Sequence, residues 1–315
     1  MALSAALLRR QPEIGGIWPL LFLGVGAAAI LAPAFRDPEN LANVIRQASV
    51  LGVLAIGQSF VLAAGMIDLS IGMIAGLSVV LGCALINGDD GKTIPVAALM
   101  LALGAAIGFV NGQLVNRLRV HPLILTFGML SVLQGVIFTY TDRSVGRSSE
   151  LLSFLANGDV LGVPCPAILL VALLAISHIA LTRSRFGLHL LAAGGDPGNA
   201  RRAGLDVRRI RLVVYVISGA TAALGGILLA GRLGTGYPLA GQGLELDALV
   251  AVVLGGAALS GGRASAPGAL AGVLLLAVLS NALNLMGVSA FVQMFVKGLI
   301  VIAAIVASQL QRSRA

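Results

Sequence analysis

Charged residues are scarce in this chain, and their scarcity decides its class. Only 11% of the 315 residues are Asp, Glu, Lys or Arg, whereas 58% are hydrophobic and the mean hydropathy is +0.98. An ordinary soluble domain has about 25% charged and roughly 45–50% apolar residues. The apolar excess is too large for a buried core alone. A soluble globular domain is therefore excluded, and the composition predicts an all-α integral membrane protein.

Residues suited to metal or redox chemistry are also few. The chain has two cysteines, Cys83 and Cys165, and three scattered histidines, none at metal-ligand spacing. We expect both cysteines to pack as small apolar side chains. Because no catalytic triad or cofactor motif accompanies them, we expect a chain without catalytic residues, resident metal or cofactor.

A complete phosphate-binding loop is missing as well. The stretch INGDDGKT ends like such a loop at Gly91, Lys92 and Thr93, but the first glycine of the motif would fall on Ile86. We interpret the stretch as a polar turn between two membrane spans. The sequence therefore predicts that any ATP chemistry, with its Mg²⁺, belongs to another subunit.

The chain is rich in apolar segments long enough to cross a bilayer. A hydrocarbon core of roughly 30 Å needs about 20 residues of helix. Ten segments qualify or nearly qualify, and the eighth is short enough to be re-entrant, so we expect eight to ten transmembrane helices in one domain over residues 1–315. The predicted spans are 17–35, 44–66, 69–86, 94–115, 123–140, 163–181, 212–230, 246–259, 267–285 and 291–308.

The distribution of arginine predicts how these spans are oriented. Most arginines fall in one alternate set of loops and in the tails, which places both termini in the cytosol under the positive-inside tendency. The cytosolic parts are then the tail 1–16, the loop 182–211 and the tail 309–315. Since the acids gather on the other side, the net charge of +8 reports topology and does not indicate a nucleic-acid partner.

An aspartate interrupts the longest apolar run. As one helix, residues 44–86 would be about 65 Å long, twice the thickness of a membrane, so the chain must turn inside this run. Gly65 can end the first helix in a left-handed conformation, and Asp68 can cap the next one. Asp247 occupies a similar place before the eighth span. The recurrence of an aspartate before a span, five spans later, is compatible with an inverted five-plus-five repeat.

Other polar residues lie within the predicted spans, where their burial is costly. Neutral amides and hydroxyls suit a path for a neutral, hydroxyl-rich solute, but they also hold helices together. Lys297 either reaches outward to the membrane surface or forms an ion pair with Glu245 or Asp247. The candidate residues of the path are Gln58, Ser59, Asn111, Thr126, Asn281 and Asn284.

The longest polar loop on the cytosolic side contains signals for a short helix. Asp196 is a natural N-cap, Pro197 suits the first helical position, and Gly204 suits the C-terminal stop. A helix this short is unstable alone, so it must rest on something. From these residues, both a capped connector on the bundle and a docking surface for a partner remain open.

Four stretches of the chain, from about residue 40 to 308, carry a resemblance to a known family. The chain resembles the permease subunit of bacterial ATP-binding-cassette (ABC) importers for carbohydrates, the ribose, xylose and galactose type. The stretches are GQSFVLAAGMIDLSIG (57–72), GFVNGQLVNRLRVHPLILTFGMLS (108–131), RFGLHLLAAGGDPGNARRAGLDVRRIRLVVYVISG (185–219) and GLELDALVAVVLGGAALSGGRASAPGALAGVLLL (243–276).

The resemblance implies roles for two sets of residues. It implies that the loop around 195–204 is the coupling helix, which docks in a cleft of the ATP-hydrolysing subunit. It also adds Asp68 and Ser70 to the residues of the path or its gate, although Met66 replaces a family glycine. The implied coupling residues are Asp196, Pro197, Ala200, Arg201, Arg202, Ala203 and Gly204.

The resemblance also implies partners and a mechanism. The partners would be an ABC ATPase, a periplasmic sugar-binding protein and a second permease copy, identical or related, in the bacterial inner membrane. The chain would then import a sugar or sugar-like solute by alternating access. Two alternatives stay open: an ABC permease for branched-chain amino acids or nucleosides, and an ion-coupled secondary transporter.

Overall fold

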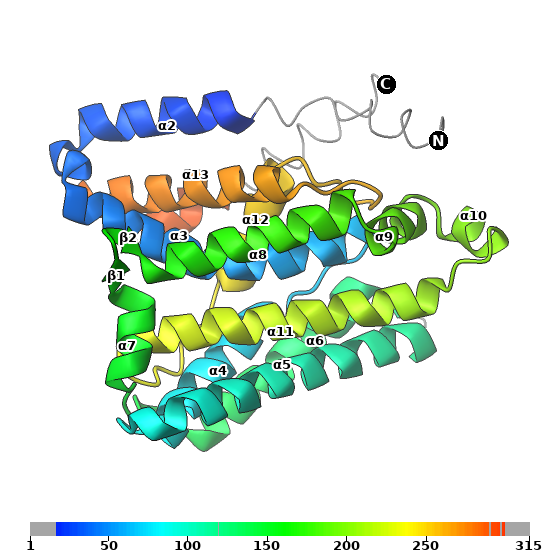
Figure 1. The fold of residues 1–315 in the computed structure, drawn as a ribbon, viewed down its shortest axis with the longest axis horizontal. Coiled ribbons are helices and arrows are strands. Elements are labelled where there is room, and N and C mark those ends of the chain that lie inside the picture. Colours follow the sequence, from blue (N-terminus) through cyan, green and yellow to red (C-terminus); the bar gives the residue numbers. More distant parts are fainter. Residues whose placement is uncertain (1–16, 119, 290, 297, 300–315) are drawn as a thin grey trace.

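The computed structural model describes residues 17–118, 120–289, 291–296 and 298–299. The described chain is a bundle of helices with one small hairpin (Figure 1). Its elements are α2 (Ile17–Leu31), η1 (Pro33–Arg36), α3 (Pro38–Ala63), α4 (Ile71–Ile86), α5 (Asp90–Leu118), α6 (Pro122–Tyr140), α7 (Glu150–Asn157), β1 (Asp159–Val160), β2 (Val163–Pro164), α8 (Cys165–Thr182), α9 (Arg185–Gly195), α10 (Pro197–Arg202), α11 (Val207–Leu233), α12 (Leu244–Leu254) and α13 (Ala266–Leu285).

Six of the described helices are long and apolar enough to cross a membrane: α3, α5, α6, α8, α11 and α13. Two more, α2 and α4, are apolar but shorter, and α12 has only 11 residues. An all-α membrane protein is therefore confirmed. The tenth predicted span, 291–308, and the tails 1–16 and 309–315 lie largely outside the described residues.

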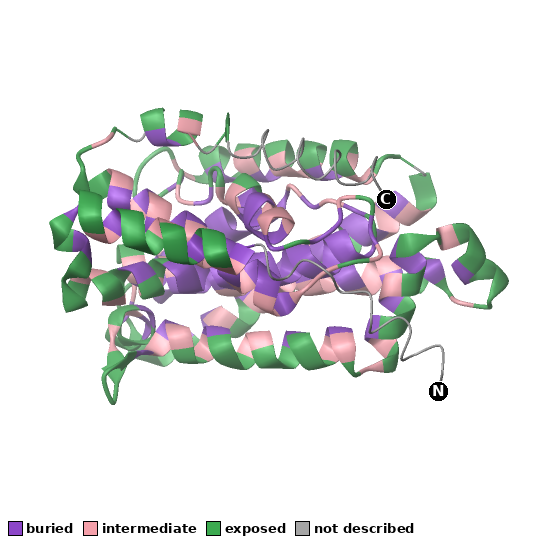
Figure 2. Cartoon of the chain, turned by 90° about the horizontal axis from the view of Figure 1, so that it is seen from above, coloured by how far each residue is buried: buried purple, intermediate pink, exposed green. Residues whose placement is uncertain are grey.

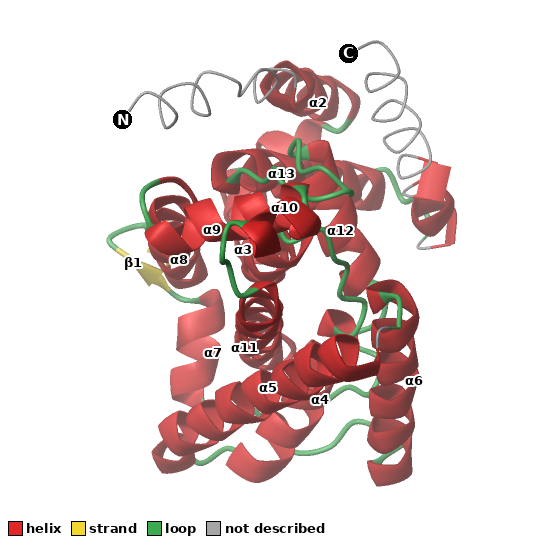
Figure 3. Ribbon diagram, turned by 90° about the vertical axis from the view of Figure 1, so that its right-hand side faces the viewer, coloured by secondary structure: helices red, strands yellow, loops and turns green. Residues whose placement is uncertain are grey.

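Helix α3 lies at the centre of the bundle, and α6 lies at its edge. In the apolar window of α3, 83% of the residues are buried, against 17% in α6. Figure 2 shows the buried residues concentrated on the inner helices, and Figure 3, which looks along the bundle from the α10 end, shows α6 and α8 on the outside. The apolar exteriors of these outer helices suit contact with lipid.

Several predicted boundaries were wrong, for identifiable reasons. Helix α3 begins at Pro38 rather than 44, because Asp37 caps it by accepting a hydrogen bond from the Glu39 amide, and its first turns are polar. The first span ends early because Pro33 starts a separate turn. The eighth ends at Leu254, since Gly255 and Gly256 follow and Gly256 has a φ of +89°.

The long apolar run breaks where the sequence predicted, but Asp68 does not cap the second helix. Gly65 ends α3 with a φ of +74°. Helix α4 begins only at Ile71, and its N-cap residue is Ser70. Asp68 stands two residues before that cap and binds other groups, which are described below. The segment 64–70 is thus an extended link between two helices, and not a tight turn with a capping aspartate.

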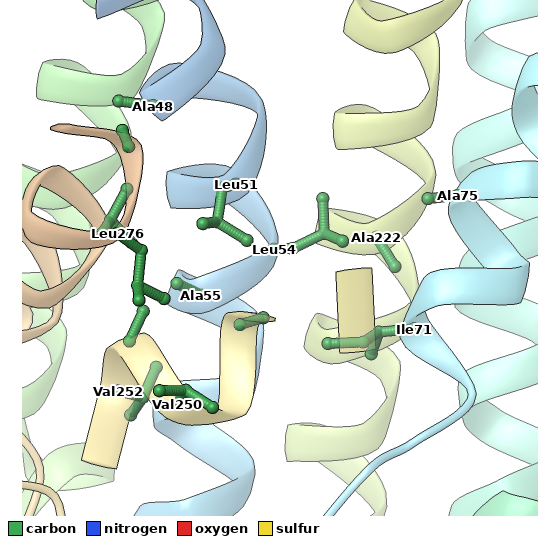
Figure 4. Close-up of a cluster of buried hydrophobic side chains, with 14 of the residues drawn as sticks. Ala48, Leu51, Leu54, Ala55, Ile71, Ala75, Ala222, Val250, Val252 and Leu276 are labelled. Atoms are coloured by element: carbon green, nitrogen blue, oxygen red, sulfur yellow. The ribbon is translucent and has the colours of Figure 1, made fainter. Parts of the chain in front are cut away.

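The apolar core joins the two parts of this broken run to the rest of the bundle. Figure 4 shows Leu51 and Ala55 of α3 beside Leu276 of α13, and Leu54 pointing toward Ala222 of α11. All of these side chains are buried. The core therefore holds α3 between α13 on one side and α11 on the other.

Glycines permit a very close helix contact between α5 and α11. A Cβ atom on Gly104 would lie 2.3 Å from the Gly219 carbonyl oxygen, and one on Gly219 would lie 2.0 Å from the Gly104 oxygen. One turn along, a Cβ atom on Gly108 would lie 2.1 Å from the Tyr215 oxygen. The predicted small-residue spacing of α5 is thus a backbone contact surface, as is usual where lipid gives helices no hydrophobic drive to associate.

Changing Gly104 to valine should therefore destabilise the bundle. The added methyl groups would overlap the α11 backbone, so we expect the free energy of unfolding to fall by about 1–3 kcal/mol. The thermal-unfolding midpoint of the purified chain in mild detergent measures the effect. The matched control is Gly135→Val on α6, where a Cβ atom meets nothing within 4 Å. Equal midpoints for the two variants would contradict the close α5–α11 contact.

Candidate functional site

Asp68 is the centre of a buried polar cluster inside the bundle. Its side chain is fully buried, and Oδ1 accepts hydrogen bonds from the backbone amide of Ser70 at 3.0 Å and from the Ser70 hydroxyl at 2.6 Å. Oδ2 accepts one from the hydroxyl of Ser218 at 2.8 Å. Since Ser218 lies near the middle of α11, the carboxylate ties the link 64–70 to that helix at mid-depth.

Two more helices, and α11 again, contribute bonds to the same link. Asn111 of α5 donates to the Ser70 hydroxyl at 2.9 Å. The Thr126 hydroxyl of α6 accepts from the Leu69 amide at 3.1 Å, and the Tyr215 hydroxyl of α11 donates to the Ile67 carbonyl at 3.3 Å. Segment 67–70 is therefore fixed from three sides. Each bond gives a backbone or hydroxyl group of the link a partner on a neighbouring helix, as is usual for polar groups at low exposure.

Glu245 approaches the first turn of α4 from the other side. Its carboxyl group packs directly on Gly72, where a Cβ atom would lie 2.0 Å from Oε2. Oε1 accepts from the Gly243 amide at 3.3 Å. The start of α4 thus lies between Asp68 and Glu245, and the positive end of its helix dipole favours a carboxylate there. Only glycine leaves room for Glu245 at position 72.

Most of the predicted path residues have partners in this structure. Asp68, Ser70, Asn111 and Thr126 belong to the cluster just described, and the Ser59 hydroxyl donates to the Ala55 carbonyl at 2.7 Å. Gln58 differs: it is fully buried on α3, and within the described part of the chain neither its amide nitrogen nor its oxygen has a hydrogen-bond partner.

The remaining two path residues form amide pairs. Asn281 of α13 and Asn40 of α3 exchange two hydrogen bonds, at 3.0 and 2.8 Å. Asn284 accepts from Gln293 at 2.7 Å. The structure therefore divides the predicted set into the Asp68 cluster, the isolated Gln58 and Ser59, and the pairs near the end of α13.

The predicted short helix in the long loop is present as α10. Asp196 caps it through bonds from the amides of Gly198 at 2.8 Å and Asn199 at 2.9 Å, and Pro197 is its first residue. Gly204 follows with a φ of +83°. Helix α10 projects from one end of the bundle (Figure 1).

Helix α10 presents one face to the protein and another to solvent. Ala200 is buried in an apolar cluster, whereas Arg201, Arg202, Ala203 and Gly204 are exposed. The helix is thus both a capped connector resting on the bundle and an exposed basic surface. The two interpretations that the sequence left open are compatible.

A seam of glycines links α10 to the Asp68 segment. We define the glycine seam as Gly65, Gly194, Gly261 and Gly262. A Cβ atom on Gly194 would lie 1.9 Å from the Ala63 oxygen, and one on Gly261 would lie 2.6 Å from the Gly65 Cα. The Gly262 amide donates to the Ala63 carbonyl at 3.0 Å. The end of α9, the end of α3 and the loop 255–265 therefore meet backbone to backbone.

Lys297 lies outside the described residues, so its predicted ion pair with Glu245 or Asp247 stays a prediction. Sequence reasoning missed Ser218 and Tyr215, which complete the Asp68 cluster. It also missed Arg232, whose Nη1 atom is buried without a hydrogen-bond partner in the described part of the chain. The signal for Arg232 was an arginine near the end of a span that the sequence predicts to face away from the cytosol, and the charge distribution was used there only to predict orientation.

Comparisons with known proteins place this geometry in context. Residues 40–305 match the model of a family described as branched-chain amino acid transport system / permease component. The chain is similar to the ribose import permease protein of Bacillus subtilis, with 39% identity over 90% of this chain and 89% of that protein. It is also similar to the ribose import permease protein of Escherichia coli K12, at 36% over 90% of each chain.

A third relative is named for a different solute. The chain is 34% identical to the L-arabinose ABC transporter permease protein of Azospirillum brasilense, over 95% of this chain and 91% of that protein. No solved structure matches significantly. The similarities span almost all of each relative, so they include both the Asp68 segment and α10.

Proposed function

Because this chain belongs to the branched-chain amino acid transport system / permease component family, we propose that it is the membrane subunit of an ABC importer that carries a sugar into the cytoplasm. The observation that carries the sugar assignment is the 39% identity to a ribose permease over 90% of the chain. The solutes in the relatives' names, ribose and L-arabinose, favour an aldopentose.

The subunit works by transmitting motion and providing a path. Helix α10, with its exposed Arg201 and Arg202, docks on a cytosolic ATPase. Movement there reaches the glycine seam, because Gly194 lies two residues before the α10 cap and contacts Ala63. The segment 67–70, which contains Asp68, begins two residues after Gly65. Movement of the glycine seam is therefore transmitted directly to this segment.

The finer architecture follows from this role. Ten spans with both termini in the cytosol, arranged as two inverted halves of five, would put α10 on the cytosolic side and α7 on the outer side. A second permease copy, identical or related, completes the path, and a periplasmic sugar-binding protein delivers the solute. Such an importer is found in the bacterial inner membrane, and ATP with Mg²⁺ is bound by the ATPase rather than by this chain, which has no catalytic role.

The path itself is assigned to Gln58, Ser59, Asp68, Ser70, Asn111, Thr126, Asn281 and Asn284. Gln58 is the strongest of these for direct solute contact, since both polar atoms of its amide lack a protein partner in the described chain. Buried amides without a partner are rare and call for a missing water or ligand. Asp68 and its partners act instead by holding the segment 67–70 in place.

The family description itself favours a second candidate, import of branched-chain amino acids. Uptake of labelled D-ribose, L-arabinose and L-leucine, each in competition with the others, separates the two. A pull-down of the tagged chain from native membranes in mild detergent tests the importer assignment. We expect an ABC ATPase to co-purify, and its absence from cells that express one would return an ion-coupled transporter to consideration.

A further inference from the structure

A half-open cavity of about 250 Å³ lies between helices of the bundle, apart from the Asp68 cluster, and one of its lining residues, Gln47, is exposed. It is formed by four helices and the loop before α12, toward the end of the bundle opposite α10. Its apolar wall includes Leu51 and Leu276, which lie between α3 and α13 in Figure 4. Its polar groups come from Gln47 on α3, Arg232 on α11, Asp247 on α12 and Ser280 on α13.

Most of the polar side chains that line this cavity form no hydrogen bond with the rest of the described chain. Within the described part of the chain, the side chains of Gln47, Arg232 and Ser280 make no hydrogen bond, and Nη1 of Arg232 is buried. A buried guanidinium nitrogen without a partner is energetically unfavourable in an apolar setting. Asp247, by contrast, already has a partner. The cavity therefore offers three unused polar side chains and one engaged carboxylate.

We infer that this cavity is a binding site for the incoming sugar within each permease subunit, an inference that rests on the proposed function. A sugar hydroxyl both donates and accepts, which matches the guanidinium donors of Arg232 and the mixed groups of Gln47 and Ser280. The C–H surface of the ring matches Leu51 and Leu276. A zwitterionic amino acid fits less well, because the carboxylate that would meet its ammonium group is already engaged.

Cysteine labelling with sugar protection tests the site in the full-length chain. In membranes carrying C83A and C165A, Gln47→Cys introduces a reporter in the cavity. The matched control is Asn43→Cys, one turn earlier on α3 and exposed. We expect millimolar D-ribose or L-arabinose to slow alkylation at position 47 but not at 43. Adding Arg232→Leu should weaken that protection about tenfold, as expected for losing hydrogen bonds from a charged group.

A bulky side chain tests the same site without removing a polar group. Ala277 lines the cavity, so Ala277→Leu should fill it and lower sugar uptake at least tenfold while the ATPase still co-purifies. The control is Gly26→Leu on α2, where a Cβ atom meets nothing within 4 Å.

The outcomes separate this inference from the proposed function. Protection by L-leucine but by neither sugar would overturn the sugar assignment of the cavity. Protection by none of the three, in membranes that take up a sugar, would overturn the site and leave the importer intact. Absence of protection in the Gln47→Cys chain, together with absence of sugar uptake by the unmodified chain, would overturn the two together.

Discussion

Changing Asp68 to alanine is expected to reduce sugar uptake at least tenfold and to destabilise the chain. The carboxylate accepts three hydrogen bonds, from the Ser70 amide and from the hydroxyls of Ser70 and Ser218. Each bond to a charged group contributes about 1.5–3 kcal/mol, and the donors left behind are buried. We expect the free energy of unfolding to fall by about 3 kcal/mol, less than the three bonds together, because the variant no longer pays the desolvation cost of a buried carboxylate. Thermal unfolding in detergent measures this change, and uptake is measured in cells.

The matched control removes a carboxylate whose ion pair with Arg143 lies exposed at the surface and contributes little to stability. Asp142→Ala changes a side chain that is 91% exposed, and it should leave uptake and stability unchanged. Ser218→Ala removes only one of the three bonds, so its effect should be smaller and should largely disappear when Asp68 is already alanine. Normal uptake by the Asp68 variant at equal membrane abundance would contradict the assigned role of the segment 67–70.

Reversing the charge of Arg201 and Arg202 together should separate the chain from its ATPase. Both side chains are exposed on α10, so Arg201→Glu with Arg202→Glu should change stability by no more than about 0.5 kcal/mol. Like charges at a docking surface cost several kcal/mol, so co-purified ATPase should fall at least tenfold. Quantitative mass spectrometry of the pull-down measures the ratio of the two subunits.

The control for this variant makes the same charge change at the other end of the molecule. Arg143→Glu with Arg147→Glu alters two exposed arginines in the loop before α7. The ATPase should stay bound to that variant. If both charge reversals released the ATPase equally, α10 would not be the specific docking element.

Local features of the fold were readable from the sequence because short-range chemistry determines them. The left-handed end of α3 at Gly65 and the Asp196–Pro197 start of α10 were both predicted correctly. Each depends on backbone conformation and capping within a few residues. The break inside the run 44–86 followed from length alone, since one helix would exceed the membrane.

The long-range partners were not readable. Asp68 was predicted as a cap, but its Oδ2 atom binds Ser218, 150 residues away. Asn40 and Asn281 are 241 residues apart, and only the packing of α3 against α13 brings their amides together. A single sequence contains no record of which polar group meets which across a bundle. For the same reason, the cavity at Arg232 was invisible until four elements were placed around it.

Reconstituted transport tests the central claim most directly. The chain would be incorporated in liposomes with its co-purified ATPase and supplied with the proposed sugar-binding protein. Uptake of labelled D-ribose and L-arabinose would be followed with and without ATP. Uptake of a sugar that requires ATP and persists when ion gradients are collapsed is the predicted result. Uptake that needs no ATP and stops when an ion gradient is collapsed would contradict the assignment.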